Sequence, residues 1–365
     1  MKYILAVFML FHGAIHLLGF VKAFGFAKVE QLNGDISRVA GVFWLLAFLF
    51  FLVAGIAFLA KADWWFIVAT IAVIISTILI SISWSDAKFG TIANIIILFA
   101  IVIGYGTWNF AHKYKKEVIT DLSHVSATPA PLLTEKDIEV LPQPVQKYIR
   151  YVGAIGKPKV NNFKIEFIGK IRKDEQSKWM TFTTEQYNFL EVAHRLFFMK
   201  AVMKGLPVAG FHCFKNGTAF MDIRLFSLFK VQYMDGKEMG ISETVTFFND
   251  MCCMAPATLI DDRISWLEVK DNKVKASFSN NGITISAWLY FNDKGELINF
   301  TSSDRCAAGE NNSMKQLPWS TPLKDYKAIN GYNLAGFAEA VYTYPTGDLC
   351  YGTFSITNIE YNCIK

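Results

Sequence analysis

Residues 38–61 have the sequence RVAGVFWLLAFLFFLVAGIAFLAK, and no side chain between Arg38 and Lys61 carries a charge. About 20 helical residues, at a rise of 1.5 Å each, cross a hydrocarbon core of roughly 30 Å. This stretch is therefore long enough to span a membrane. Three further stretches, of 21 to 26 residues, carry no charge between their ends, and they lie at residues 2–22, 63–86 and 88–113. We expect residues 1–116 to form a four-helix transmembrane domain.

The composition agrees with a membrane protein. The chain is 53% hydrophobic and 18% charged, which is too apolar for an ordinary soluble protein of 365 residues. We expect a multi-pass protein of the bacterial inner membrane, with the lipid bilayer as its partner. The net charge of +5 lies entirely in residues 1–116, and the remainder is formally neutral. A neutral domain argues against binding to nucleic acid, because contacts with phosphates need a concentrated basic face.

The side of the membrane follows weakly from the charges. Basic residues divide five to four between the two ends of the expected helices, with the larger number on the N-terminal side. The positive-inside rule then places both termini, and with them the C-terminal domain, in the cytoplasm. The six cysteines show no disulfide spacing, which agrees with a reducing compartment.

Two histidines lie inside the first apolar stretch. His12 and His16 are four residues apart, so they lie on one face of a helix, and an imidazole in lipid should face other helices. One hypothesis is an intramembrane metal or haem redox protein that uses both as ligands. The alternative, which we favour, is hydrogen bonding between helices, with Asn94, Ser76 or Thr77 as partners. We therefore predict no metal site and no cofactor.

The composition changes after Lys116. Residues 117–133 are rich in Ser, Thr and Pro, so we expect a linker. Residues 134–365 should form a soluble α+β domain, in which residues 163–172 alternate apolar and charged side chains as a half-exposed strand does. Residues 242–254 have the pattern of a helix packed on a sheet. Further strands are predicted at 177–189, 195–201, 208–222, 229–234, 322–330 and 348–361, with an antiparallel meander at 264–305.

The expected sheet has few helices to cover it. A sheet of about ten strands must twist and curve to bury its apolar side. We predict an antiparallel, strongly curved sheet, a half-barrel or open barrel, with short covering helices. The order of a short helix and then such a sheet resembles that of carrier proteins that sequester lipoprotein acyl chains. An apolar concavity beside a membrane anchor suits a lipid or an acylated partner as ligand.

Several segments also resemble a bacterial family of uncharacterised membrane proteins. They are His12–Phe20, Asp86–Asn94, Arg195–Ala201, Glu243–Cys252 and Phe300–Arg305. The resemblance extends over nearly the whole chain. It implies an N-terminal four-helix membrane region and a C-terminal β-rich domain of unknown function, and it implies no activity.

The common catalytic signatures are absent from the sequence: H-E-x-x-H, G-x-S-x-G, G-x-x-x-x-G-K-[ST] and C-x-x-C. An uncatalogued hydrolase would have to use charged or titratable residues in apolar surroundings, for which the candidates are Arg195, His212, Asp250 and Asp304. Buried ion pairs that fix the sheet are the favoured alternative. Glu243 lies seven residues before Asp250, and we expect it to interact with the N-terminus of its helix. A binding protein is therefore favoured over an enzyme.

Overall fold

The structure of the protein is a computed structural model that describes residues 2–309 and 313–365. By its internal contacts the chain divides into two compact units, Met1–Phe110 and Ala111–Lys365.

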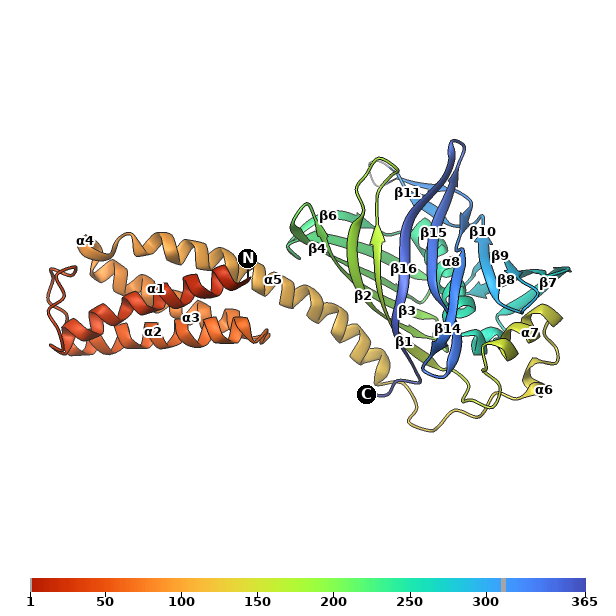
Figure 1. Cartoon of the computed structure of the whole chain (residues 1–365), viewed down its shortest axis with the longest axis horizontal. Coiled ribbons are helices and arrows are strands. Elements are labelled where there is room, and N and C mark those ends of the chain that lie inside the picture. The colour runs from red at the N-terminus through yellow and green to blue at the C-terminus, as the bar shows by residue number, and fades with distance from the viewer. Residues whose placement is uncertain (1, 310–312) are drawn as a thin grey trace. The chain divides into compact units, whose positions relative to one another are not determined.

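The first unit consists of apolar helices (Figure 1). They are α1 (Lys2–Ala23), α2 (Arg38–Leu59), α3 (Trp65–Ile82), the short α4 (Trp84–Ala87) and the first part of α5 (Gly90–Leu122). Among the described residues, four helices are long and apolar enough to cross a membrane: α1, α2, α3 and α5. Glycine allows α1 and α2 to pack closely, because a Cβ atom at Gly13 would lie 2.7 Å from Cβ of Phe51.

The last turns of α5 belong to the second unit. α5 continues to Leu122, so residues 117–122, which we assigned to an extended linker, are helical. Neither glycine nor proline interrupts them, and the extended segment begins only after the helix ends. Tyr114 of this helix packs on the sheet, with its ring centroid 5.2 Å from that of Phe198 and 5.6 Å from that of Phe211. These turns cover part of one face of the sheet.

One large antiparallel sheet dominates the second unit. Its described strands, fourteen in number, have the order β6-β5-β4-β3-β2-β1-β16-β15-β13-β10-β9-β8-β7, and β14 pairs with β15. In chain order they are β1 (Asn162–Ile171), β2 (Met180–Phe189), β3 (His194–Met203), β4 (Leu206–Lys215), β5 (Thr218–Leu225), β6 (Phe229–Met234), β7 (Ile264–Lys270), β8 (Lys273–Asn280), β9 (Ile283–Phe291), β10 (Leu297–Ser302), β13 (Trp319–Ser320), β14 (Leu323–Ile329), β15 (Tyr332–Tyr344) and β16 (Gly347–Tyr361).

Smaller elements complete the unit. Two short strands, β11 (Cys306–Ala308) and β12 (Met314–Gln316), pair with each other. The helices are α6 (Glu135–Ile138), α7 (Gln143–Tyr151) and α8 (Lys237–Met254), followed by the single 3₁₀ turn η1 (Pro256–Ile260). α8 begins earlier than the residue 242 that the sequence pattern predicted.

The predicted half-barrel or open barrel is not found, because the sheet is neither closed nor strongly curled. The reason is α8, which lies against one face of the sheet (Figure 1) and is buried along most of its length. Phe247 and Phe248 of α8 stack on Phe278, and Phe248 also contacts Phe300 edge to face. The helix supplies the apolar surface that a curled sheet would otherwise have to supply itself.

The strand register assigns each side chain to a face. We call the face that carries α8 the inner face and the opposite one the outer face. On β3, Arg195 contacts α8, so Phe197, Met199 and Ala201, at alternate positions, also belong to the inner face. Their neighbours on the outer face include Phe198, which packs against α5.

Candidate functional site

A network of buried charges lies between α8 and the inner face. The guanidinium of Arg195, on β3, lies between two carboxylates of α8. Its Nε donates to Oδ2 of Asp250 at 2.8 Å, and its Nη1 donates to Oε2 of Glu243 at 3.0 Å. A spacing of seven residues places both carboxylates on one face of the helix. All three side chains are at least nine-tenths buried, so the sheet and the helix are joined through an ion pair with two anions.

Two amides of β2 complete the network. Nη2 of Arg195 donates to Oε1 of Gln186 at 2.9 Å. Oδ2 of Asp250 accepts from Nε2 of Gln186 at 2.8 Å and from Nδ2 of Asn188 at 3.1 Å. Because buried polar groups are costly without partners, this mutual satisfaction fixes the positions of all the side chains involved.

The two carboxyls of the network have different pKa values. Burial is the largest single effect and would raise the pKa of Glu243, but Arg195, His212 and Arg305 together outweigh it and lower the pKa to about 2. At Asp250 burial is the stronger effect and raises the pKa above its ordinary value, although Arg195 opposes it. Glu243 is therefore a permanent anion, whereas Asp250 is the member of the pair that more readily takes up a proton.

His212 lies at the margin of this network. It belongs to β4 and faces α8, with Nδ1 at 3.9 Å from Oε1 of Glu243. Its side chain keeps 21% of its surface exposed, unlike the nearly inaccessible Glu243. Burial lowers the pKa of His212, so the neutral ring is favoured. The ring centroid lies 5.3 Å from that of Phe197, so His212 also contacts the apolar part of the inner face.

A second arginine, Arg305, also contacts α8. Its Nε donates to the hydroxyl of Tyr342 at 3.0 Å, and its Nη1 donates to the carbonyl of Ser242 at 3.1 Å and to Oγ1 of Thr246. The guanidinium carbon lies 4.6 Å from the ring centroid of Trp319. Within the described part of the chain, no carboxylate lies within the 4.0 Å that defines an ion pair with Arg305.

The structure brings together three of the four residues that the sequence suggested for a hydrolase: Arg195, His212 and Asp250. Asp304 is not among them, because its Oδ2 accepts from the backbone N–H of Ser286 at 2.7 Å, on β9. Glu243 belongs to the site as well. Our expectation that it interacts with the N-terminus of its helix is wrong, because α8 begins at Lys237 and Glu243 lies beyond its first turn.

Sequence reasoning missed Gln186 and Asn188. One signal for the two amides was present in the sequence. Thr184, Gln186 and Asn188 alternate with Glu185 and Tyr187, so one face of an expected strand is polar without being charged. Arg305 ends the segment Phe300–Arg305 that the family resemblance included, but its partners lie far away in the sequence and could not be predicted.

A separate apolar cluster lies on the inner face next to the network. It consists of Phe182, Phe197, Met199 and Ala201, with Ile171 and Phe354 packed against it. No residue of α8 belongs to this cluster, which is distinct from the main core around the helix. Beside it, Ile223 and Leu225 of β5 are only half-buried. The inner face is therefore apolar beyond the area that α8 covers.

Thr184 and Gly210 also lie in this apolar area of the inner face. Oγ1 of Thr184, paired with Met199 across the strands, is buried and has no hydrogen-bond partner among the described residues. Gly210 lies opposite Met199 on the next strand and lacks a side chain altogether. A Cβ atom at Gly210 would meet nothing closer than Cε of Met199 at 3.5 Å, so there is room above this glycine.

The two histidines of α1 lie in the first unit, and neutral groups bind them. His12 Nε2 lies 2.9 Å from Oδ1 of Asn94, and His16 Nε2 lies 2.9 Å from Oγ of Ser76. Asn94 in turn donates to Oγ1 of Thr77 at 3.0 Å. Two of the three partners that we named, Asn94 and Ser76, bond to the histidines directly, and Thr77 bonds to Asn94 instead. Among the described residues no group of three or more His, Cys, Asp or Glu side chains is arranged to hold a metal ion.

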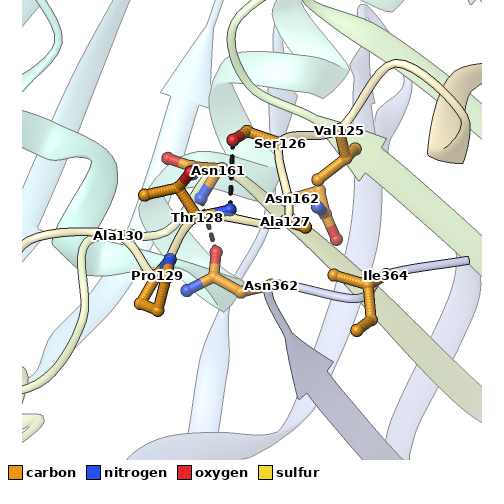
Figure 2. Close-up of a pocket in the computed structure, with 10 residues that line it drawn as sticks. All are labelled: Val125, Ser126, Ala127, Thr128, Pro129, Ala130, Asn161, Asn162, Asn362 and Ile364. Atoms are coloured by element: carbon orange, nitrogen blue, oxygen red, sulfur yellow. Dashed lines mark hydrogen bonds between the residues drawn. The ribbon is translucent and has the colours of Figure 1, made fainter.

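A small pocket of about 160 Å³ lies where the segment after α5 meets the C-terminal segment (Figure 2). The backbone N–H of Asn161 donates to Oδ1 of Asn362 at 2.8 Å, which joins two of its walls. The pocket is smaller than the roughly 300–1,000 Å³ of most ligand sites. No charged side chain lines it. Its lining residues are Val125, Ser126, Ala127, Thr128, Pro129, Ala130, Asn161, Asn162, Asn362 and Ile364.

Comparisons with known proteins identify a family but no activity. No curated protein matches the chain. Among solved structures, a LolA superfamily protein from Nitrosomonas europaea is 8% identical, with a TM-score of 0.33 over 64% of this chain and 96% of that one. A DUF1329 family protein from Desulfovibrio piger is 11% identical, with a TM-score of 0.34 over 60% of this chain and 92% of that one. The model of a family of unknown function, DUF6544, matches residues 131–354, which include the buried network and the apolar cluster, so this protein belongs to the DUF6544 family.

Proposed function

We propose that this protein is a multi-pass membrane protein whose β-rich domain binds an apolar ligand, a lipid or an acylated partner, on the inner face of the sheet. The observation that carries the proposal is the apolar cluster of Phe182, Phe197, Met199 and Ala201, which lies outside the core formed with α8. Protein atoms already leave these four side chains only 4–7% exposed, and the half-buried Ile223 and Leu225 beside them are the part of this face that a ligand would cover.

Two neighbouring features support a bound ligand rather than simple packing. Thr184 has a buried hydroxyl without a partner, and a ligand or a water molecule would supply one. Gly210 leaves room between Met199 and Ile223. Each acyl CH₂ removed from water contributes about 0.8 kcal/mol, so burying ten of them would gain roughly 8 kcal/mol before ordering costs.

The membrane part of the proposal rests on α1, α2, α3 and α5, which are long and apolar enough to span. We propose the bacterial inner membrane, with the β-rich domain in the cytoplasm. Protease added outside intact spheroplasts should then leave the β-rich domain uncut. Rapid cleavage in residues 123–133 would place the domain on the opposite side.

A photoactivatable acyl probe tests the binding proposal. The full chain, reconstituted in nanodiscs, is exposed to a diazirine-bearing palmitic acid and to its methyl ester, and labelled peptides are mapped by mass spectrometry. We expect labelling of residues 180–203 and 206–225 in addition to the apolar helices. Labelling confined to the helices would refute the proposal.

A pair of variants on opposite faces serves as the control. Gly210→Phe places a ring over the inner face and should reduce labelling of the sheet. Val202→Phe places the same ring on the outer face, where Val202 is already exposed, and should leave labelling unchanged. Equal losses in both variants would indicate a general effect on folding.

The alternatives have less support from the geometry. For the metal or haem hypothesis, the Nε2 atoms of both His12 and His16 are engaged by Asn94 and Ser76, so a ligand role would require these bonds to break. For the hydrolase hypothesis, Arg195 and Asp250 bind each other, and Asp304 lies elsewhere. We therefore propose binding rather than catalysis.

A further inference from the structure

We propose that the ligand of the inner face carries an anionic head group, as a free fatty acid does, and that Arg305 binds this head group. The inference rests on the proposed function and names the class of ligand for the same site. It is carried by the arrangement of the two arginines around α8.

The two arginines differ in their partners. Arg195 is saturated, because its Nε, Nη1 and Nη2 donate to Asp250, Glu243 and Gln186. Arg305 is held in place only by neutral acceptors, a tyrosine hydroxyl, a threonine hydroxyl and a carbonyl. Its Nη2 makes no hydrogen bond within the described chain. Arg305 is therefore a positioned cation with free donors.

The surroundings of Arg305 hold it rigidly. Trp319 stacks on the guanidinium, and the indole N–H of Trp319 donates to the hydroxyl of Tyr351 at 3.2 Å. Tyr342, which accepts from Arg305, donates to the carbonyl of Cys306 at 2.9 Å. An arginine fixed in this way can bind a carboxylate through its planar guanidinium with little further loss of side-chain entropy.

Arg305 and the apolar cluster meet around Glu243. The Glu243 carboxylate interacts electrostatically with Arg305 and lies 3.9 Å from His212, whose ring packs on Phe197 of the cluster. A head group at Arg305 would thus have an apolar face within reach of its chain. The hydroxyl of Thr184, on the same face, is buried and has no hydrogen-bond partner among the described residues.

Arg305 has no anion in direct contact within the described part of the chain. Both buried carboxylates of α8 already bind Arg195, so neither compensates Arg305 through direct contact. A partly buried cation without a contacting anion is costly, and a carboxylate head group in contact with Arg305 would lower that cost.

The acid and ester probes test this inference directly. In nanodiscs made of zwitterionic phosphatidylcholine, at mildly alkaline pH, the wild-type chain should label residues 180–203 more strongly with the diazirine fatty acid than with its methyl ester. Arg305→Gln should weaken labelling by the acid on the order of tenfold, which corresponds to the loss of one charge-assisted hydrogen bond, and should leave ester labelling unchanged. Arg305→Lys keeps the charge and should retain part of the preference.

The control is Arg150→Gln, which removes an exposed arginine paired with Glu135 and should change neither signal. The inference is overturned if Arg305→Gln labels with the acid as well as the wild type does. It is also overturned if the wild type shows no preference for the acid, a result that does not require any variant to fold. If neither probe labels the sheet of the wild type, the proposed function itself fails.

Discussion

The two units each bury a polar cluster, and the two clusters are built differently. In the helical unit, His12, His16, Ser76 and Asn94 form a network of neutral groups that satisfy one another. In the β-rich unit, Arg195 is bound to two carboxylates. Charges are expensive in a hydrocarbon environment, whereas neutral hydrogen bonds join helices at small cost.

The two clusters also differ in how far their members are exposed. The helical cluster is complete within its own unit, which suits a role in holding α1, α3 and α5 together. The β cluster has partly exposed members at its margin, His212 and Arg305. We infer that a polar cluster whose groups are satisfied within its own unit stabilises the fold, and that a cluster with partly exposed members marks a place where a ligand can bind.

The largest effect is expected at the centre of the charged cluster. Arg195→Met leaves Glu243 and Asp250 buried without their cation, and it should lower the free energy of unfolding of the β-rich unit by about 3–5 kcal/mol. Denaturant unfolding followed by near-ultraviolet circular dichroism measures this loss. Arg150→Met breaks an exposed pair and should cost at most about 1 kcal/mol. Similar losses in the two variants would contradict the central role of Arg195.

A smaller effect is expected in the neutral cluster. Asn94→Leu removes the amide that joins His12, Ser76 and Thr77, and should lower the stability of the helical unit by about 1–2 kcal/mol in a detergent titration. Thr70→Val is the matched control, because Oγ1 of Thr70 bonds only to the carbonyl of Phe66 in its own helix. A metal or haem that co-purifies with the wild type and is lost with His12→Phe would instead support the redox hypothesis.

The charged cluster should respond to pH through His212. Burial lowers its pKa, so below pH 6.5 the unfolded chain takes up a proton that the folded chain refuses. Stability should therefore fall as the pH is lowered from 6.5, with a slope of up to about 1.4 kcal/mol per pH unit. Glu243, whose pKa is lowered to about 2, contributes only below its unfolded value of 4.5. His212→Asn should flatten the profile between pH 5 and 7, and an unchanged slope would show that another group is responsible.

The smallest effect is expected at Thr184. Its buried hydroxyl has no protein partner, so Thr184→Val should leave stability unchanged or raise it by up to about 1 kcal/mol. The hydroxyl of Thr244 donates to the carbonyl of Gly240 at 2.8 Å, and Thr244→Val should be destabilising by comparison. Thermal unfolding measures both. If Thr184→Val proves as destabilising as Thr244→Val, the hydroxyl has a partner and the argument for a ligand there is weakened.

The helices could be predicted from the sequence because their signal is local. Charged residues bound each long apolar stretch, and α2 begins and ends close to Arg38 and Lys61. Most strands were predicted for the same reason, through alternation within a few residues. One local signal was overlooked: Asn216-Gly217, both at positive φ, forms the turn between β4 and β5, so residues 208–222 are not one strand.

The candidate site was only partly predictable. Arg195, His212 and Asp250 stood out as charged or titratable groups in apolar surroundings. Their partners could not be read from spacing, because Arg195 and Asp250 are 55 residues apart and meet only when α8 packs on the sheet. The half-barrel was mispredicted for a related reason. Sequence patterns do not show how much of a sheet one fully buried helix can cover.

The pairing of β1 with β16 has a consequence for how the chain is made. β1 begins at residue 162 and β16 ends at residue 361, yet they are neighbours in the middle of the sheet. During synthesis β1 is made long before β16, so one edge of β1 must stay unpaired until residues 347–361 leave the ribosome. Pairings between such distant segments form slowly and expose edges that can aggregate. The two halves of the sheet can therefore join only once β16 has been made, and the loss of β16 would leave them unjoined.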